Sequence, residues 1–448
     1  MSDKRIHLLR DENVFKSLVT MATPAILGLI VQAVYNMVDT MFVSWLGPTA
    51  TGATQIVFVI TTALSAIGLM FGIGVSTYIS RLLGRNKIEQ AEKAFSIVFN
   101  GAVVVGLTIT LLFFIFINPL LRLVGATDSL LPMSKDYSNY LIFGFPFMIL
   151  NMLMNNSLRG EGSAKYSMTG MGLGALLNII LDPIFIFVFN LGIKGAAIAT
   201  SISQIVTTLI LISFYLRGKS LLKFKFRFKL FDTIIWKEVL KVGVTSFLTQ
   251  LLMSISISFI NNQAGVYGGD NAIAAIGIVT KLIYISIFVF FGLGMGLQPL
   301  AGYSYGAKNS KRLLQALYYA IIISFTLGLL FNLIIYFFGE NIISIFKPSE
   351  AVFEYAILYI NIFMISITTM SIQFNVIYFL QAIGKGFISL LFSISRQGLL
   401  LIPLLLILPK YYGINGVFYA QAVSDIIIFI FTLIVLFIIV KKFKKKIR

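Results

Sequence analysis

Twelve stretches of about 20 mainly apolar residues restrict the fold of this chain more than any other feature. They cover residues 16–45, 54–80, 94–118, 136–158, 165–188, 192–216, 238–264, 273–302, 316–338, 352–378, 387–408 and 413–440. A helix of about 20 apolar residues crosses a bilayer and satisfies its own backbone hydrogen bonds there. With 58% hydrophobic and only 12% charged residues, the chain lacks the polar surface of a soluble protein. We therefore expect an all-α integral membrane protein with twelve transmembrane helices.

The residue inventory excludes several kinds of active site. There is no cysteine, and the single histidine, His7, lies in the charged N-terminal segment. Disulfides, thiolate metal sites, histidine clusters and a Ser-His-Asp triad are therefore ruled out. No GxxxxGK[ST] motif occurs, so nothing indicates ATP as an energy source. We expect neither an enzyme nor a bound cofactor.

The basic residues indicate how the chain is oriented. With twelve spans, both termini lie on one side, and 28 of the 35 Lys and Arg residues fall on that side. The positive-inside rule assigns it to the cytoplasm. The net charge of +18 then marks the cytoplasmic face rather than a nucleic-acid partner, and the KFKFRFK run at 223–229 is interpreted as a linker on an anionic membrane surface.

The two halves of the chain repeat each other. A shift of 222 positions aligns Gly72 with Gly294, Ala94 with Ala316, Tyr137 with Tyr359 and Gly162 with Gly384. A shift of 221 places GIKGAAIATSIS (192–203) on GINGVFYAQAVS (413–424). Six spans per half is an even number, which predicts a pseudo-two-fold axis along the membrane normal and a substrate site between the halves. The predicted parts are an N-terminal lobe at 1–216, a basic cytoplasmic linker at 217–237 and a C-terminal lobe at 238–448.

Two acids of the first half are the main functional candidates, because a charge inside the hydrocarbon layer is costly. Asp39 and Asp182 each lie six residues from the outer end of their span, at a depth of ~9 Å. Asn178 and Thr200 lie roughly 12–15 Å deep. Together they offer oxygen ligands for Na⁺, or two carboxylates that share a proton. The alternative is a hydrogen-bond network that holds helices together.

The second half does not repeat these acids. Asp39 corresponds to Asn261, and Asp182 corresponds to Leu404. Any cation coupling should therefore belong to the first half. The charged residues of the second half have other interpretations.

Arg396 and Asp425 both lie about 18 Å deep, and we interpret them as a buried structural pair. Lys281 has no acid at its depth, so it either lines the central cavity or extends its ammonium group toward the membrane surface.

Neutral residues extend the candidate site. Gln32, Tyr35, Asn36 and Asp39 share one face of the first span. Pro24 in the same span predicts either a functional bend or a static kink. Asn151 and Asn155 share a face of the fourth span, where they contact substrate or hold helices together.

Several motifs together resemble the multidrug and toxic compound extrusion (MATE) family over essentially the whole chain. They are Pro24 with Gln32, Tyr35, Asn36 and Asp39; FGIGVSTYISRLLGRNK (71–87); LRGEGSAK (158–165); Asn178-x-x-x-Asp182-Pro183; and GIKGAAIAT, which ends at Thr200. The sequence is most similar to the bacterial DinF-like branch, which includes MepA-like drug exporters. The resemblance implies a cation site formed by Asp39, Asn178, Asp182 and Thr200. It also implies a nearby substrate cavity lined by Gln32, Tyr35, Asn36, Tyr137, Asn151, Asn155 and Met171. The NorM-like branch uses acids of the seventh and tenth spans, and this chain has none in the middle of either span.

The expected function is that of a monomeric, cation-coupled (H⁺ or Na⁺) multidrug efflux antiporter of the bacterial cytoplasmic membrane, with both termini cytoplasmic. It would export drug-like, often cationic, compounds by alternating access, with no metal beyond Na⁺ at the cation site. One alternative is a lipid-linked oligosaccharide flippase, which needs a strongly basic cavity; only Lys281 and Arg396 are candidates for one. A membrane-embedded enzyme would need clustered nucleophile and base groups near an interface.

Overall fold

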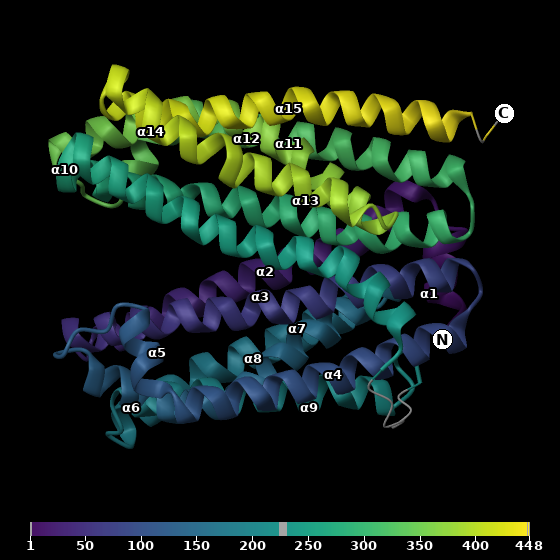
Figure 1. Cartoon of the computed structure of the whole chain (residues 1–448), viewed down its shortest axis with the longest axis horizontal. Coiled ribbons are helices and arrows are strands. Elements are labelled where there is room, and N and C mark those ends of the chain that lie inside the picture. Colours follow the sequence, from purple (N-terminus) through teal and green to yellow (C-terminus); the bar gives the residue numbers. More distant parts are fainter. Residues whose placement is uncertain (1, 224–230, 446, 448) are drawn as a thin grey trace. The chain divides into compact units, whose positions relative to one another are not determined.

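The computed structural model describes residues 2–223, 231–445 and 447, and all regular secondary structure in these ranges is helical (Figure 1). Most of the KFKFRFK run lies outside the described residues. The first half contains α1 (Ser2–Arg10), α2 (Val14–Ser44), α3 (Pro48–Gly84), α4 (Ile88–Ile115), α5 (Ile117–Leu123), α6 (Leu131–Leu141), η1 (Ile142–Gly144), α7 (Phe145–Gly160), α8 (Ala164–Pro183), η2 (Ile184–Val188) and α9 (Ile193–Leu216). The second half contains α10 (Thr233–Gly306), α11 (Ser310–Ser344), α12 (Glu350–Ala382), α13 (Gly386–Ile394), η3 (Ser395–Leu400), α14 (Leu401–Tyr412) and α15 (Ile414–Lys444).

Within the described residues, eleven helical segments are long and apolar enough to cross a membrane. One of them, α10, has 74 residues and would measure about 110 Å, far more than the ~30 Å hydrocarbon core. Gly269 interrupts it with φ 64° and ψ −163°, a conformation that glycine adopts readily. α10 is therefore two spans joined at Gly269, and the prediction of twelve transmembrane helices is confirmed.

The chain forms two compact units. The N-terminal unit consists of Met1–Asp11 and Leu27–Phe247, and the C-terminal unit consists of Glu12–Ile26 and Leu248–Arg448. Two of the three boundaries between the units, after Ile26 and after Phe247, fall inside the long helices α2 and α10, and they lie 221 residues apart. This is the offset of the sequence repeat, so the two halves are divided at equivalent points. The first part of α2 belongs to the C-terminal unit, and the first part of α10 belongs to the N-terminal unit.

A glycine of the repeated GIKG and GING motifs allows helices to meet backbone to backbone in each unit. A Cβ atom on Gly195, in α9, would lie 2.5 Å from the carbonyl oxygen of Phe185 in η2. The equivalent Gly416, in α15, contacts the backbone of Leu408 and Pro409 in α14. Backbone atoms cannot move aside as a flexible side chain can. The duplicated glycine therefore fixes how the last helix of each half approaches the preceding one.

We expect Gly195→Ala and Gly416→Ala each to lower the free energy of unfolding by about 1–3 kcal/mol, since a Cβ atom overfills the contact. Elsewhere in a helix the same change usually stabilises, because alanine has the higher helix propensity. Gly172→Ala is the matched control, since its Cβ would meet no atom within 4 Å. The measurement is thermal unfolding of the purified proteins. Equal unfolding temperatures for all three variants would contradict this account of the motif.

The described residues at the start of the predicted linker are held by a buried carboxylate. Glu161, fully buried after α7, accepts hydrogen bonds from Ser220 Oγ at 2.7 Å and from the amides of Leu221 and Leu222 at 3.0 and 3.2 Å. Burial raises the pKa of Glu161 above its ordinary value, and the hydrogen bonds from Ser220 and Ser163 act in the opposite direction. The sequence placed Glu161 among ordinary loop acids, but it anchors the chain that leaves α9.

Two more contacts fix this segment to the beginning of α4. Glu92 Oε1 accepts the amide hydrogen of Lys223 at 3.1 Å. After the residues that the structure leaves undescribed, Asp232 pairs with Lys93 at 2.6 Å. The described parts of the predicted linker therefore pack against the N-terminal unit.

Candidate functional site

The two acids of the first half meet in the N-terminal unit. Asp39 on α2 and Asp182 near the end of α8 interact side chain to side chain. Asn178, one turn before Asp182, donates from Nδ2 to Asp182 Oδ1 at 3.2 Å. The same Nδ2 lies 3.4 Å from Thr200 Oγ1 of α9. The structure thus brings together all four residues that the sequence assigned to a cation site.

Three oxygen atoms of this cluster lack a hydrogen-bond donor among the described residues. They are Asp39 Oδ1, Asn178 Oδ1 and Asp182 Oδ2, and all three are buried. A buried acceptor without a donor costs about 1–3 kcal/mol, and more if it is charged. Two neighbouring carboxylates also repel each other unless a proton or a cation lies between them. The chemistry of the cluster suits a hard cation or a shared proton.

The position of Asp182 follows from the local sequence. Pro183 cannot donate a backbone hydrogen bond, and the helix continues as the π-helical segment η2 directly after it. Short π-helical segments often occur at functional sites, because they break the regular helical ladder. The fifth span of the second half has the same irregularity, η3, which carries Arg396. Both halves therefore place a charged residue at or beside a π-helical segment.

Tyrosines adjoin the acids. Tyr35 on α2 and Tyr137 on α6 are within electrostatic range of both Asp39 and Asp182. The other two polar residues on this part of α2 lie at its surface: Gln32 is partly exposed and Asn36 is exposed. Of the four residues predicted to share a face of the first span, Tyr35 and Asp39 enter the cluster.

Asn151 links helices. Its Nδ2 donates to the backbone oxygen of Gln204 at 3.0 Å and to Gln204 Oε1 at 2.7 Å, while its Oδ1 accepts from Thr208 at 2.8 Å. The second half repeats this link between α12 and α15, because Gln373, 222 residues later, donates to the backbone oxygen of Asp425 at 2.7 Å. These bonds favour the helix-packing alternative for Asn151.

A buried cation close to Asn155 was missed in the sequence. α7 extends to Gly160, beyond the predicted end at residue 158, so Arg159 lies in its last turn with 7% of its surface exposed. Its guanidinium donates to Ser167 Oγ and to Asn156 Oδ1, both at 2.8 Å. Ser167 in turn donates to Asn155 at 3.1 Å. A helix end estimated one residue too early removed Arg159 from the list of intramembrane charges.

Met171 and Pro24 are the two remaining candidate residues, and each lies in its own surroundings. Met171 Sδ lies 3.9 Å from Arg159 Nη1, and a Cβ on Gly28 of α2 would lie 3.5 Å from the same sulfur. Met171 therefore contacts α2 one turn beyond Pro24. Pro24 lies inside the continuous helix α2, two residues before the break between the units at Ile26. A bend at Pro24 stays a prediction.

The charges of the second half lie in different surroundings. Arg396 Nε donates to Asp425 Oδ1 at 2.7 Å, and both side chains are buried. The Arg396 guanidinium also lies over the Phe374 ring, 5.0 Å from its centroid. Lys281 is exposed, with its ammonium 6.0 Å from the ring centroid of Phe346, just beyond the end of α11. This geometry favours the interpretation that Lys281 extends toward the membrane surface.

The family model named MatE matches residues 24–184 and 243–407, which together make up most of the chain and both halves of the repeat. The chain belongs to the MATE family. The family resemblance noted in the sequence is therefore confirmed, and so is the twelve-helix, two-lobe fold. A MATE family member is a membrane transporter of small molecules rather than an enzyme.

Known MATE proteins resemble the chain over nearly its full length. The multidrug export protein MepA of Staphylococcus aureus is 27% identical over 429 residues, covering 95% of this chain and 94% of that protein. A MOP superfamily transporter from Pyrococcus furiosus has a TM-score of 0.92 and 28% identity, covering 98% and 99%. An outward-facing multidrug resistance MATE family transporter has the same TM-score, identity and coverage. The chain is thus a multi-pass membrane protein that matches nearly the full length of these relatives.

Proposed function

We propose that this MATE transporter is a multidrug efflux antiporter that exports drug-like, often cationic, compounds in exchange for H⁺ or Na⁺. The proposed coupling site is Asp39, Asn178, Asp182 and Thr200. The multidrug export activity that the name of the MepA relatives states supports the substrate class. Both termini would lie in the cytoplasm, as the distribution of basic residues indicates.

The observation that carries the proposal is the pair of interacting carboxyl groups with buried oxygens that lack donors. No Lys or Arg forms a salt bridge with either acid among the described residues. A structural network would instead pair each oxygen with a donor, as the Arg396–Asp425 pair does. The two halves therefore differ: the second half neutralises its acid internally, and the first half leaves its acids for an ion.

Ion binding at these acids would change the charge of a site on three helices, α2, α8 and α9. A ligand shifts a conformational equilibrium only through its different affinity for the two states. We infer that the cation favours the state in which the oxygens of α2, α8 and α9 converge. The substrate would favour the other state, so that binding of one promotes release of the other. Tyrosines such as Tyr35 offer an aromatic face to organic cations.

The test is transport by the purified protein in liposomes, with ethidium as the probe cation. A pH gradient and a Na⁺ gradient are imposed separately, and a third set of liposomes has neither. We expect one gradient to raise the initial rate of ethidium movement at least fivefold over the gradient-free set, and its reversal to reverse the direction. Equal rates in all three sets would refute the coupling, and no ethidium movement in any set would refute the proposed substrate class.

The flippase alternative has little support in the described residues. Of the two basic residues that it relied on, Arg396 is paired with Asp425 and Lys281 lies beside Phe346. Arg159 is buried, and its guanidinium donates to the neutral side chains of Ser167 and Asn156 in its own unit. We therefore retain the antiporter as the single proposed function.

A further inference from the structure

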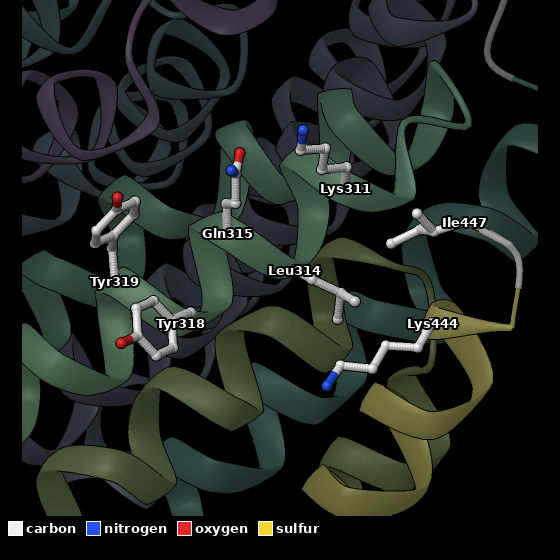
Figure 2. A pocket seen from close by; sticks show the side chains of 7 residues that line it. All are labelled: Lys311, Leu314, Gln315, Tyr318, Tyr319, Lys444 and Ile447. Carbon is white, nitrogen blue, oxygen red and sulfur yellow. The ribbon is translucent and has the colours of Figure 1, made fainter.

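The C-terminal unit has a hollow between the start of α11 and the end of α15 (Figure 2). Its volume is about 330 Å³, at the lower end of the range for small-molecule sites. The residues that line it include Lys311, Leu314, Gln315, Tyr318, Tyr319 and Lys444. These helix ends lie on the side of the chain termini, where the sequence places the cytoplasmic membrane surface.

One face of α11 forms most of this hollow. Lys311, Leu314, Gln315 and Tyr318 follow the spacing i, i+3, i+4 and i+7, which aligns their side chains along the helix. The face runs from a charge at the helix start to an aromatic ring one to two turns further into the span. Tyrosine is enriched at this level of membrane proteins, because its ring is apolar and its hydroxyl is polar. The hollow therefore offers a polar end and an apolar end, as an amphiphilic ligand requires.

The positive charge of the hollow has no acidic partner among the residues that the structure describes. Among the described residues, neither Lys311 nor Lys444 forms a salt bridge with a carboxylate. Lys444 enters from α15, so the two ammonium groups come from different helices. The two ammonium groups point away from each other in Figure 2, and each is free to attract an anionic group.

The equivalent place in the N-terminal unit shows what such a hollow accommodates. By the repeat, Lys311 corresponds to Glu89, Leu314 to Glu92 and Lys444 to Lys223. There the chain itself occupies the place, since Glu92 accepts the amide hydrogen of Lys223. This place in the N-terminal unit is acidic, and Glu92 binds the last described residue before the gap in the linker. The corresponding positions of the C-terminal unit, Lys311 and Lys444, are both basic.

From these observations we propose that the hollow binds the head group of an anionic phospholipid, which Lys311 and Lys444 attract from two different helices. Tyr318 and Leu314 then contact the glycerol and the upper part of the acyl chains. Basic pockets between transmembrane helices at the cytoplasmic surface commonly bind anionic head groups. The proposal is independent of the coupling ion and of the exported substrate.

The test compares lipid binding by the purified full-length protein, measured by native mass spectrometry with phosphatidylglycerol and phosphatidylcholine. We expect the wild type to prefer phosphatidylglycerol, and Lys311→Gln with Lys444→Gln to reduce that preference about tenfold. Lys441→Gln with Lys445→Gln is the matched control, because it removes two exposed charges from the same helix end outside the hollow. We expect the control to keep at least half of the preference.

Three results would overturn the proposal. The first is an unchanged lipid preference in the Lys311 and Lys444 double variant. The second is an equal loss in the control variant, which would show that the whole basic surface, rather than the hollow, attracts the lipid. The third is complete displacement of phosphatidylglycerol by millimolar inorganic phosphate, which would identify a site for free phosphate. Because the readout is a ratio of two lipids in one protein sample, a variant that folds poorly lowers both signals and leaves the ratio interpretable.

Discussion

Asp182→Asn should abolish ion-driven transport in liposomes, with an initial rate at least tenfold below wild type. Asn has nearly the same shape as Asp but carries no charge and neither binds nor releases a proton at pH 7. Its side-chain oxygen can still accept from Asn178 Nδ2, which lies 3.2 Å from Asp182 Oδ1 in the wild type. The packing of α8 should therefore survive while the ion site is lost. Asp39→Asn should have the same effect, because its carboxyl group belongs to the same pair.

The matched control is Asp136→Asn, which removes an exposed acid of the same unit. Asp136 pairs with Lys194 at 3.3 Å, with 48% of its side chain exposed, so its loss should change transport by less than twofold. Ethidium binding, measured without a gradient, tests substrate recognition separately from ion coupling. We expect Asp182→Asn to keep binding within about threefold of wild type. A variant that still moves ethidium with the wild-type dependence on the gradient would show that Asp182 is not the coupling residue.

Spans and depths could be predicted from the sequence because the bilayer imposes a length. Asp39 and Asp182 each lie six residues from an end of a span, and this alone placed them at one level. The same reasoning paired Arg396 with Asp425, which form a hydrogen bond at 2.7 Å. Rotation about the helix axis is not fixed by depth. Depth therefore could not show whether Asn151 contacts substrate or packs helices together. Its hydrogen bonds to Gln204 favour helix packing.

The ends of the spans were harder to predict, because polar residues there are buried by neighbours that are distant in sequence. Glu161 follows α7 and reads as a loop residue, yet Ser220 and the amides of Leu221 and Leu222 enclose it. Hydropathy averages over a window and cannot detect a contact between residues 60 positions apart. Arg159 was missed for a different reason, because it lies one residue beyond the predicted end of its span.

A different prediction concerns the second half: Asp425→Leu should lower the free energy of unfolding by about 3–5 kcal/mol. The change leaves the Arg396 guanidinium, with only 5% of its surface exposed, without its carboxylate. Gln421 Nε2 also loses the acceptor Asp425 Oδ2, which lies at 3.0 Å. An uncompensated charge inside the membrane-spanning part is among the most costly defects a fold can carry. Thermal unfolding of the purified protein measures the loss.

The double variant Arg396→Met with Asp425→Leu decides whether the pair acts only in packing. It removes both charges and keeps side chains of similar volume, so most of the stability lost in Asp425→Leu should return. If the pair is structural, the double variant should also move ethidium in response to the same gradient as wild type, since the proposed coupling acids lie in the other unit. Stability restored without gradient-driven transport would assign a direct part in coupling to Arg396 or Asp425. Stability that stays as low as in the single variant would mean that the lost bonds of Gln421 and the π-helical segment η3, rather than the charges, determine the cost.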